Sequence, residues 1–557
     1  MSLSSESMIR EETPHARQRI AAVSSMALIV TGLLLVALLV FAFVKQFKTD
    51  DAFMFYRYVV HMRAGLGISW NADGVHTYGL TSLPWLAVVG VFSLLPINTA
   101  HLLTAASCAT FIVAAAVMVV VVRRNALSEF FRQPRILIPV LLLPLLLQPN
   151  FDLEFMNGME TMLSLLANAV LVAATLQFMK VQSARNAALL GFAGYLAFLV
   201  RPDNGLCGAL IPVLLWLIWP GARNAYFLVA EACMFSAIAI QLWAADRYFG
   251  TPVPLAFYLK SLHGYRGYIS PINPGVELAR FLLMASPFLL ATLVFAARTR
   301  RVRFVAIFLI PVACSSAYLL TVVQIMGTNA RYYVPFLPFV VIPAILVVDC
   351  WLAEGRRWPT SAPKRQIVRL AALLLLCIAG VYGVSVVIVR HQNSLRVLYP
   401  EPKRIVRASA PLGESAVDVR CGLGRLFAQQ LPAGTVMAAS EVGCLGSLAP
   451  QVNIIDVVGL NDREIATSGF SMDRLLDRSP DVIWLPHPAY TWLRAQMWDD
   501  PKFLAQYEVY DHAFDYGIAI RKNSTERVLI ESAFSRAWSR AYPGKAMEDY
   551  RVLGLSS

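Results

Sequence analysis

Residues 20–51 read IAAVSSMALIVTGLLLVALLVFAFVKQFKTDD, and this run sets the organisation of the whole chain. Its apolar part, 20–44, is long enough to cross a bilayer as one helix. Two adjacent carboxylates, Asp50 and Asp51, follow within a few residues. Because two neighbouring negative charges repel each other and are costly to bury in hydrocarbon, they mark the point where the chain enters water.

The composition extends this reading to the rest of the chain. Of 557 residues, 57% are hydrophobic and only 15% are charged, and the mean hydropathy is +0.58. A soluble globular domain does not need that much apolar surface, so we expect a polytopic membrane protein. The formal net charge is +13, but many of the basic residues lie in short loops between apolar segments. Such residues orient the chain in the membrane, so nucleic-acid binding is not expected.

The first apolar segment predicts an uncleaved anchor whose start is cytoplasmic. Arg10, Arg17 and Arg19 precede it, and it lacks a small-residue cleavage site. The next apolar run, 83–97, is short and contains a proline near each end, which is typical of an interfacial or re-entrant helix. We therefore expect residues 45–100 to form one large outer loop that carries a membrane-lying helix.

The later apolar segments predict a regular alternation across the membrane. With the anchor they give about eleven spans, the others being approximately 101–122, 135–148, 159–179, 186–200, 204–220, 224–245, 276–297, 303–325, 332–352 and 367–389. Basic residues gather in five alternate loops, namely 123–135, 180–185, 223, 298–303 and 356–365. Loops of one sign at alternate positions predict a cytoplasmic N-terminus and an outer C-terminus.

The long apolar runs of the sequence end near residue 390. Residues 1–390 are expected to form the membrane domain, and 391–557 an extracytoplasmic soluble α/β domain. Short apolar runs at 435–439, 453–458 and 481–485 predict buried strands, alternating with helical stretches such as 413–430 and 462–478. Cys421 and Cys444 are the only cysteines of this region, and we expect them to lie close enough to bridge in an oxidising compartment.

The predicted topology gathers many charged side chains on the outer face. They come from five separate loops, which carry Asp50, Asp51, Arg57 and His76; Glu160; Arg201 and Asp203; Lys260 and His263; and Arg331 and Tyr332. For several of them, a purely structural or membrane-anchoring role remains open. Arg201 and Asp203 can form a structural ion pair, and Lys260 and Arg331 can anchor the protein to anionic lipid headgroups.

A family resemblance gives these loops a more specific meaning. The run Asp-Asp-Ala-Phe-Met-Phe-Tyr-Arg-Tyr (50–58) is followed by AGLGISWN (64–71) and TYGLTS (77–82). The later pieces, in order, are NGMET (157–161), LVRPD (199–203), FGTPVP (249–254) with Lys260, Arg331-Tyr332 with Pro335, GCLG (443–446) and IDVVGLND (455–462). Together they resemble GT-C superfamily glycosyltransferases that use polyprenyl-phosphate sugars, in particular the mycobacterial terminal β-(1→2) arabinofuranosyltransferase family.

The resemblance implies a GT-C type helical membrane enzyme with its active site outside the cytoplasm of a bacterial inner membrane. It implies transfer of a sugar, with β-D-arabinofuranose as the first choice, from a polyprenyl phosphate to a hydroxyl of a cell-envelope glycan or glycoconjugate, with inversion. Asp50 or Asp51 would act as general base. The expected contacts to donor phosphate or sugar are Arg57, Glu160, Arg201, Lys260, His263, Arg331 and Tyr332. No cofactor is expected, although a divalent metal stays open.

Two kinds of alternative remain at this stage. The same fold could transfer another polyprenyl-phosphate sugar, such as mannose, to a protein or lipid acceptor. The chain could instead be a transporter or flippase, or a non-catalytic envelope assembly protein. Transporters usually show internal repeats and charges inside their spans, whereas this chain has no evident repeat and its charges lie at one end of the spans.

Overall fold

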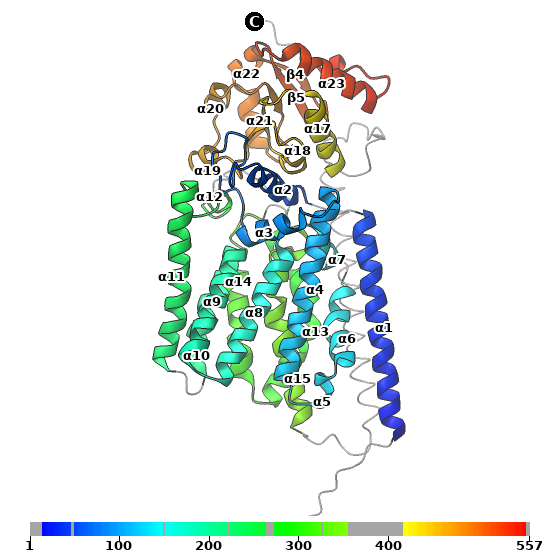
Figure 1. Ribbon diagram of the computed structural model, residues 1–557, viewed down its shortest axis with the longest axis vertical. Helices are drawn as coiled ribbons and strands as arrows, with labels where there is room; N and C mark the ends of the chain where they lie inside the picture. The colour runs from blue at the N-terminus through cyan, green and yellow to red at the C-terminus, as the bar shows by residue number, and fades with distance from the viewer. Residues whose placement is uncertain are drawn as a thin grey trace, which may run out of the picture.

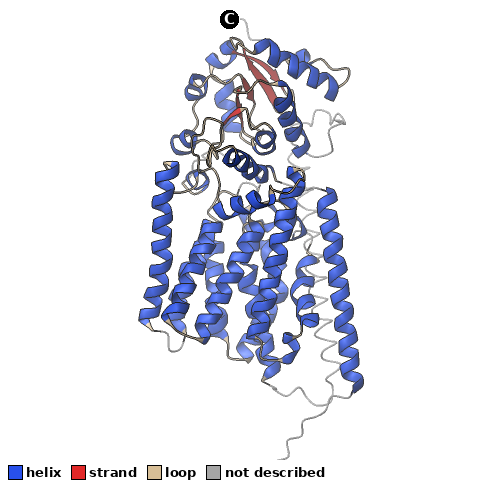
Figure 2. Ribbon diagram, in the orientation of Figure 1, coloured by secondary structure: helices blue, strands red, loops and turns tan. Residues whose placement is uncertain are grey.

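The computed structural model describes residues 14–45, 49–148, 151–219, 223–262, 272–324, 327–354 and 416–552. A bundle of long helices forms one end of the molecule, and a smaller domain that contains the sheet lies on top of it (Figures 1 and 2). The described helices bear out the prediction of a helical polytopic membrane protein with a C-terminal α/β domain.

Among the described residues, seven helices are long and apolar enough to cross a membrane. They are α1 (Pro14–Lys45), α4 (Thr99–Asn125), α8 (Thr161–Lys180), α11 (Asn224–Phe249), α13 (Pro274–Arg298), α14 (Val302–Leu319), and α15 (Leu337–Ala353) together with the preceding turns η2 (Thr328–Ala330) and η3 (Val334–Phe336). Three shorter apolar helices stand beside them, α6 (Pro134–Leu146), α9 (Ala184–Val200) and α10 (Gly205–Ile218). These ten correspond to ten predicted spans, whereas the eleventh, 367–389, lies outside the described residues.

Burial shows how the bundle is arranged. Of the 18-residue apolar stretch of each spanning helix, 72% is buried inside the protein in α15, compared with 11% in α1 and in α11. α15 is therefore the centre of the bundle, and α1 and α11 lie at its periphery with most of their apolar surface left for lipid. The short helix α5 (Glu129–Arg132) lies at the end of the bundle far from the sheet, whereas α7 (Phe151–Met156) and α12 (Leu255–Lys260) lie near the opposite end (Figure 1).

The first loop lies across the end of the bundle. It contains α2 (Asp50–Arg63) and α3 (Leu83–Phe92), which lie between the bundle and the upper domain (Figure 1). Ser82 caps α3 by accepting a hydrogen bond from the Trp85 N–H at 3.2 Å. A helix of 10 residues extends only about 15 Å, too short to cross the hydrocarbon, so α3 rests on the bundle.

The upper domain is built on a five-stranded mixed sheet with the order β2-β1-β3-β5-β4. The strands are β1 (Val436–Ala439), β2 (Asn453–Asp456), β3 (Val482–Trp484), β4 (Tyr507–Asp511) and β5 (Gly517–Arg521), of which β1 to β3 are parallel and β5 is antiparallel to both neighbours. The rest of the domain consists of α17 (Ala416–Gln430), α18 (Gly443–Leu448), α19 (Arg463–Ser468), α20 (Met472–Asp477), α21 (Thr491–Trp498), α22 (Pro501–Gln506), α23 (Arg527–Ala541) and η4 (Met547–Tyr550), whereas η1 (Pro202–Asn204) lies between α9 and α10 of the bundle.

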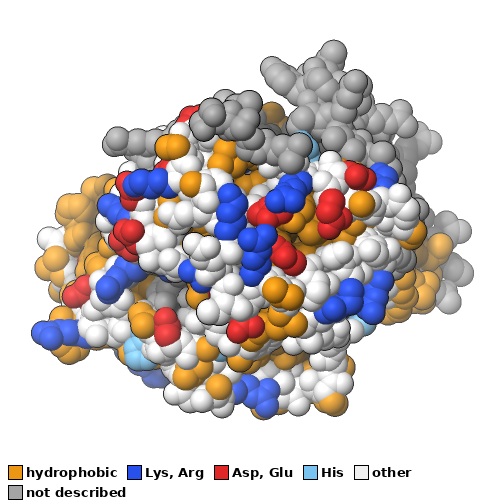
Figure 3. Space-filling model, turned by 90° about the horizontal axis from the view of Figure 1, so that it is seen from above, with side chains coloured by type: hydrophobic (Ala, Val, Ile, Leu, Met, Phe, Trp, Pro, Cys, Tyr) orange, Lys and Arg blue, Asp and Glu red, His pale blue; other side chains and the backbone are white. Residues whose placement is uncertain are grey.

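The three predicted strands are confirmed, and β4 and β5 were not foreseen. The predicted helical stretch 462–478 is divided into α19 and α20 at Gly469, whose φ of 82° is a left-handed conformation that favours glycine. Seen from above, the exposed face of this domain carries acidic and basic side chains interspersed with smaller hydrophobic patches (Figure 3). That face is suited to water, in contrast to the sides of the bundle.

The first loop and the upper domain share one hydrophobic core. Phe53, Tyr58 and Trp70 of the first loop belong to the same buried cluster as Leu445 and Ile454 of the upper domain. The predicted boundary at residue 390 lies outside the described residues. In packing terms, however, α2 is as much a part of the upper domain as of the bundle.

A disulfide fastens the helices at this junction. Cys421 of α17 and Cys444 of α18 are bonded, with their Cα atoms 5.0 Å apart. This confirms the expected proximity of the pair. The disulfide joins α17 to α18, the helix that α2 contacts, so it stiffens the contact between the upper domain and the first loop.

Candidate active site

A pocket opens where the bundle, the first loop and the upper domain meet. Its empty volume is about 940 Å³ with the open mouth included. Its charged lining comes from α2, α12 and three interhelical turns, and consists of Asp51, Glu160, Asp203, Arg201, Lys260 and Arg331. Three carboxylates thus face three cations, as the convergence of the outer loops predicted.

Asp50 and Asp51 face in different directions. Successive residues of a helix point about 100° apart, and of the two aspartates only Asp51 lines the pocket. Asp50 is 3% exposed, and its carboxylate accepts hydrogen bonds from the backbone N–H groups of Gly443 at 2.8 Å and Cys444 at 3.0 Å. The two residues, equivalent in the sequence, therefore have separate surroundings.

Burial raises the pKa of the Asp51 carboxyl above its ordinary value, and the positive charges of Lys260 and Arg331 oppose that shift. A carboxylate in this setting is a stronger base than one in water, and the two cations favour its ionised form. Asp51 is thus electrostatically suited to remove a proton from a hydroxyl in the pocket.

Arg57 does not line the pocket, and the expectation that it contacts a donor is corrected by its position. Its side chain is fully buried, with Nε donating to the Trp70 carbonyl at 2.6 Å. The other guanidinium nitrogens donate to the carbonyls of Gly446, Ala449 and Val452 and to the Asn71 side chain. Burial lowers the pKa of Arg57 to about 9, and these acceptors keep it protonated at neutral pH. Arg57 joins the first loop to the upper domain.

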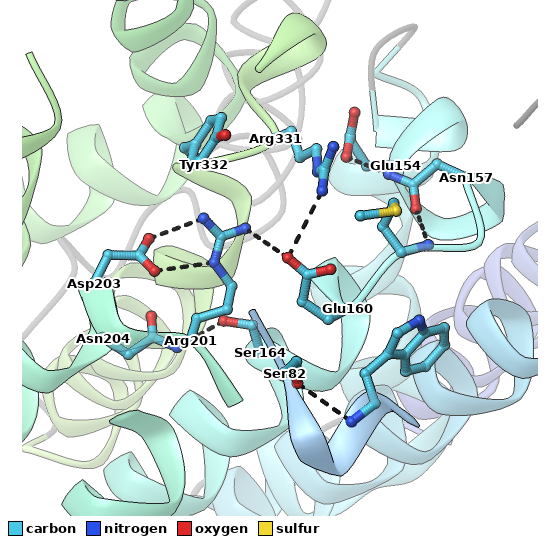
Figure 4. A network of polar contacts seen from close by, with 12 residues as sticks. Ser82, Glu154, Asn157, Glu160, Ser164, Arg201, Asp203, Asn204, Arg331 and Tyr332 are labelled. Atoms are coloured by element: carbon cyan, nitrogen blue, oxygen red, sulfur yellow. Dashed lines mark hydrogen bonds and ion pairs between the residues drawn. The ribbon is translucent and has the colours of Figure 1, made fainter. Parts of the chain in front are cut away.

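A tight turn places Glu160 in the pocket wall. The Oδ1 atom of Asn157 accepts from the Met159 N–H at 2.9 Å, and Gly158 has a φ of 80°. A Cβ on Gly158 would lie 3.1 Å from that of Ala52 on α2, so the turn needs glycine both for its conformation and for this close approach. Glu160 then precedes α8 with its side chain directed between two arginines (Figure 4).

Glu160 is an electrostatic bridge. Its Oε1 atom lies 3.6 Å from Nη1 of Arg201 and 3.7 Å from Nη2 of Arg331, and the side chain is 3% exposed (Figure 4). Its Oε2 atom is buried without a hydrogen-bond partner. One buried carboxylate therefore holds two guanidinium groups side by side despite their mutual repulsion.

The Arg201-Pro202 junction ends α9 and turns the arginine inward. A residue before proline avoids the helical region, and Arg201 has φ −150° and ψ 123°. Its guanidinium donates two hydrogen bonds to Asp203, at 3.0 and 3.1 Å, and lies 4.8 Å from the centre of the Tyr332 ring. With Asp203 and Glu160 on either side, Arg201 supports the pocket wall more than it offers a free cation.

Arg331 follows a strained turn. Asn329 and Ala330 have φ values of 60° and 62°, which side chains rarely adopt. The Ala330 N–H donates to Oε2 of Glu277 at 2.7 Å, and Glu277 also pairs with Arg280 at 2.7 Å. Glu277 on α13 thereby holds the turn that presents Arg331 to the pocket.

Lys260 reaches the pocket from the end of α12. The helix begins with the Leu255 N–H donating to the Tyr78 carbonyl at 2.9 Å, which ties α12 to the first loop. The Nζ atom of Lys260 lies 3.4 Å from the Tyr332 hydroxyl. Lys260 thus contacts a neutral group, a phenol, whereas Arg201 and Arg331 both lie beside the Glu160 carboxylate.

The remaining candidates lie elsewhere. His263 lies outside the described residues. His76 stacks on Tyr248 with ring centroids 4.0 Å apart and is not part of the pocket lining.

Glu154 and Glu277 were not foreseen as supporting residues. Burial raises the pKa of Glu154 to about 8, and the charge of Arg331 opposes that shift.

Metal binding finds no support in the described part of the chain. There, no group of three or more His, Cys, Asp or Glu side chains is arranged to hold a metal ion. That a metal is not needed stays a prediction, because the lining carries carboxylates as well as cations.

Comparison with known proteins identifies the fold. ArnT from Cupriavidus metallidurans bound to undecaprenyl phosphate has a similar structure, with a TM-score of 0.51 and 14% sequence identity over 88% of this chain and 98% of ArnT. The chain has a GT-C type fold. ArnT from the same organism in the apo state is also similar, with a TM-score of 0.48 and 12% identity over 87% of this chain and 97% of that one.

Sequence comparisons add one partial match. A family described as "Domain of unknown function (DUF8728)" matches residues 412–537, which is most of the upper domain. No curated protein matches the chain. At 14% identity the likeness to ArnT establishes the fold alone, so the activity has to be argued from the site.

Proposed function

We propose that this protein is a membrane glycosyltransferase that moves a sugar from a polyprenyl phosphate to an acceptor hydroxyl. The observation that carries the proposal is the pairing of Asp51 with Lys260 and Arg331 in one pocket at the end of the bundle. A base and two phosphate-binding cations within one pocket are the groups that such a transfer needs. The undecaprenyl phosphate bound by ArnT, which shares the fold, supports a polyprenyl phosphate as the lipid.

The reaction divides among these residues as follows. The Asp51 carboxylate takes the proton of the acceptor hydroxyl, whose oxygen forms a bond to the anomeric carbon. The bond from that carbon to the phosphate oxygen breaks, and the phosphate leaves with the bonding electrons. Attack opposite the leaving group inverts the anomeric carbon. Lys260 and Arg331 neutralise the phosphate, a role in which charge-assisted hydrogen bonds are strong.

The sugar we propose is β-D-arabinofuranose, on the strength of the first-loop and later motifs alone. Another polyprenyl-phosphate sugar such as mannose is the second choice. We place the pocket and the upper domain outside the cytoplasm of a bacterial inner membrane, because those of the basic loops that the structure describes lie at the other end of the bundle. The acceptor is a hydroxyl of a glycan, a glycolipid or a protein.

The test is direct transfer by the purified full-length chain. The protein is given a panel of polyprenyl-phosphate sugars with envelope glycan acceptors, and the release of polyprenyl phosphate and the anomeric configuration of the product are measured. One donor should be consumed by the wild type and not by Asp51→Asn. Consumption of none, or equal consumption by both proteins, would overturn the proposal.

A further inference from the structure

We infer that Asp50 is a positioning residue that couples the upper domain to Asp51, and that the Cys421–Cys444 disulfide is part of this coupling. The inference rests on the proposed function for its activity measurements. It assigns the second carboxylate of the Asp50-Asp51 pair a task other than catalysis. It also makes the upper domain a component of the active site.

The contact between Asp50 and α18 is unusually close. Both oxygens of the Asp50 carboxylate accept backbone N–H groups, from Gly443 at 2.8 Å and Cys444 at 3.0 Å. A Cβ added to Gly443 would collide with the backbone carbonyl of Asp50. Since charge-assisted hydrogen bonds are directional, this pair of bonds fixes the rotation of the first turn of α2 against α18.

That rotation determines where Asp51 points. Asp51 is the next residue on α2, and in the rotation that Asp50 holds its side chain lines the pocket. Near the middle of α2, two turns further along, Arg57 donates to the carbonyls of Gly446 and Ala449, at and just after the end of α18. α18 is thus held to α2 at both of its ends, and a shift of α18 would be carried to Asp51.

The disulfide bonds α18 to α17. Cys444 supplies both the sulfur bonded to Cys421 and a backbone N–H bonded to Asp50. Reduction by a dithiol gives two thiols on the protein and an intramolecular disulfide on the reagent, with one electron and one proton reaching each cysteine sulfur. It leaves α18 attached to α17 by packing, by the Arg420–Glu441 ion pair just before α18 and by the hydrogen bonds that Gln451, just after α18, donates to α17. The upper domain would then present Asp51 less firmly.

The experiment compares Asp50→Asn, the double variant Cys421→Ser/Cys444→Ser, and their combination. The asparagine is isosteric but turns an N–H toward one of the two backbone donors. We expect turnover to fall about tenfold to hundredfold, the range for losing a charge-assisted hydrogen bond, with the KM for the donor nearly unchanged. The combined variant should fall no further than the more damaged parent, because both changes release the same contact.

A readout independent of activity is hydrogen exchange at residues 443–448. The Gly443 and Cys444 N–H groups are the donors to Asp50, so their exchange should quicken in Asp50→Asn and after reduction of the wild type with dithiothreitol. Cys314→Ser, which removes an exposed free cysteine, is the matched control and should respond to reduction as the wild type does. This arm gives an answer even if no donor is transferred, so failure of the proposed function would be distinguished from failure of the coupling.

Two outcomes would overturn the inference. One is that Asp50→Asn abolishes turnover as fully as Asp51→Asn while exchange at 443–448 stays unchanged, which would make Asp50 the base. The other is that the losses of Asp50→Asn and of the cysteine variant multiply in the combined protein. If the cysteine variant does not fold, reduction of the folded wild type supplies the same comparison.

Discussion

The Nζ atom of Lys260 lies 3.4 Å from the hydroxyl of Tyr332, and both side chains belong to the lining of the pocket. Lys260 comes from α12, which is hydrogen-bonded to the first loop, whereas Tyr332 follows the strained turn at 329–330. Lys260 and Tyr332, which are 72 residues apart in the sequence, thus meet in the pocket where the proposed donor phosphate would bind. The guanidinium carbon of Arg331 lies 6.0 Å from the centre of the Tyr332 ring.

Removing either cation should weaken donor binding. Lys260→Ala and Arg331→Ala each delete a charge-assisted contact to the phosphate, which is worth about 1.5–3 kcal/mol. We expect a loss of about tenfold to hundredfold in donor affinity together with a loss in rate. The measurement is binding and turnover with a polyprenyl-phosphate sugar. Lys180→Ala, at the opposite end of the bundle, is the control and should bind normally; equal affinity in all four proteins would remove both cations from the phosphate site.

The dependence of turnover on pH should report Asp51. The base acts when ionised, and burial raises its pKa, so activity is full above that raised pKa and is lost as the pH falls through it. Lys260 favours the ionised form. In Lys260→Met the acid limb of the kcat profile at saturating donor should therefore move to higher pH. A limb that stays in place would show that Lys260 does not act on the base.

Arg57→Lys should destabilise the protein without a direct effect on donor contacts. A lysine cannot supply the five hydrogen bonds that the Arg57 guanidinium donates, of which three cross to the upper domain and two stay within the first loop. Several buried carbonyls would lose their donors, so we expect a loss of at least about 3 kcal/mol in the free energy of unfolding. Thermal unfolding of the purified protein measures it. Normal stability with lost donor binding would restore Arg57 to the donor site.

The sequence contained more of the fold than of the site. Hydropathy and basic loops predicted ten of the described apolar helices, seven of them long enough to cross a membrane, and the Arg201-Pro202-Asp203 run allowed an ion pair that the structure shows. Arg57 was assigned to the donor site wrongly. No sequence pattern indicates that this cation will bind backbone carbonyls of distant residues such as Val452, which lies 395 residues further along the chain. The support of Arg331 by Glu277 likewise depends on how α13 packs against a distant turn.

The two acidic residues illustrate the same limit. Adjacent aspartates are interchangeable in a motif, and only the rotation of α2 tells that Asp51 faces the pocket and Asp50 faces α18. β4 and β5 escaped notice for a related reason. They form the antiparallel edge of the sheet, with polar residues such as Glu508 and Arg521 within or at the end of the strands, so their apolar runs are short.

The topology makes a separate prediction. The pocket and the upper domain lie at the end of the bundle away from the basic loops, so both should be extracytoplasmic. Alkaline phosphatase fused after Ser557, which is active only outside the cytoplasm, should be active, and green fluorescent protein at the same place should be dark after export through the general secretory route. A fusion after Arg300, in one of the basic loops, is the control and should give the opposite pair of results. Reversed signals would move the proposed site to the cytoplasmic face.

Chelation should leave the enzyme active. In the proposed mechanism Lys260 and Arg331 compensate the charge of the leaving phosphate, which is the task that a divalent cation performs in many phosphate sites. Turnover in excess EDTA should therefore match that in buffer, and added Mg²⁺ or Mn²⁺ should change it less than twofold, a change of about 0.4 kcal/mol in the barrier. Collapse of activity with EDTA and recovery with one metal would contradict this division of roles. The carboxylates of Asp51 and Glu160 would then be the first ligands to test, by asking whether Glu160→Gln raises the metal concentration needed for half-maximal rate.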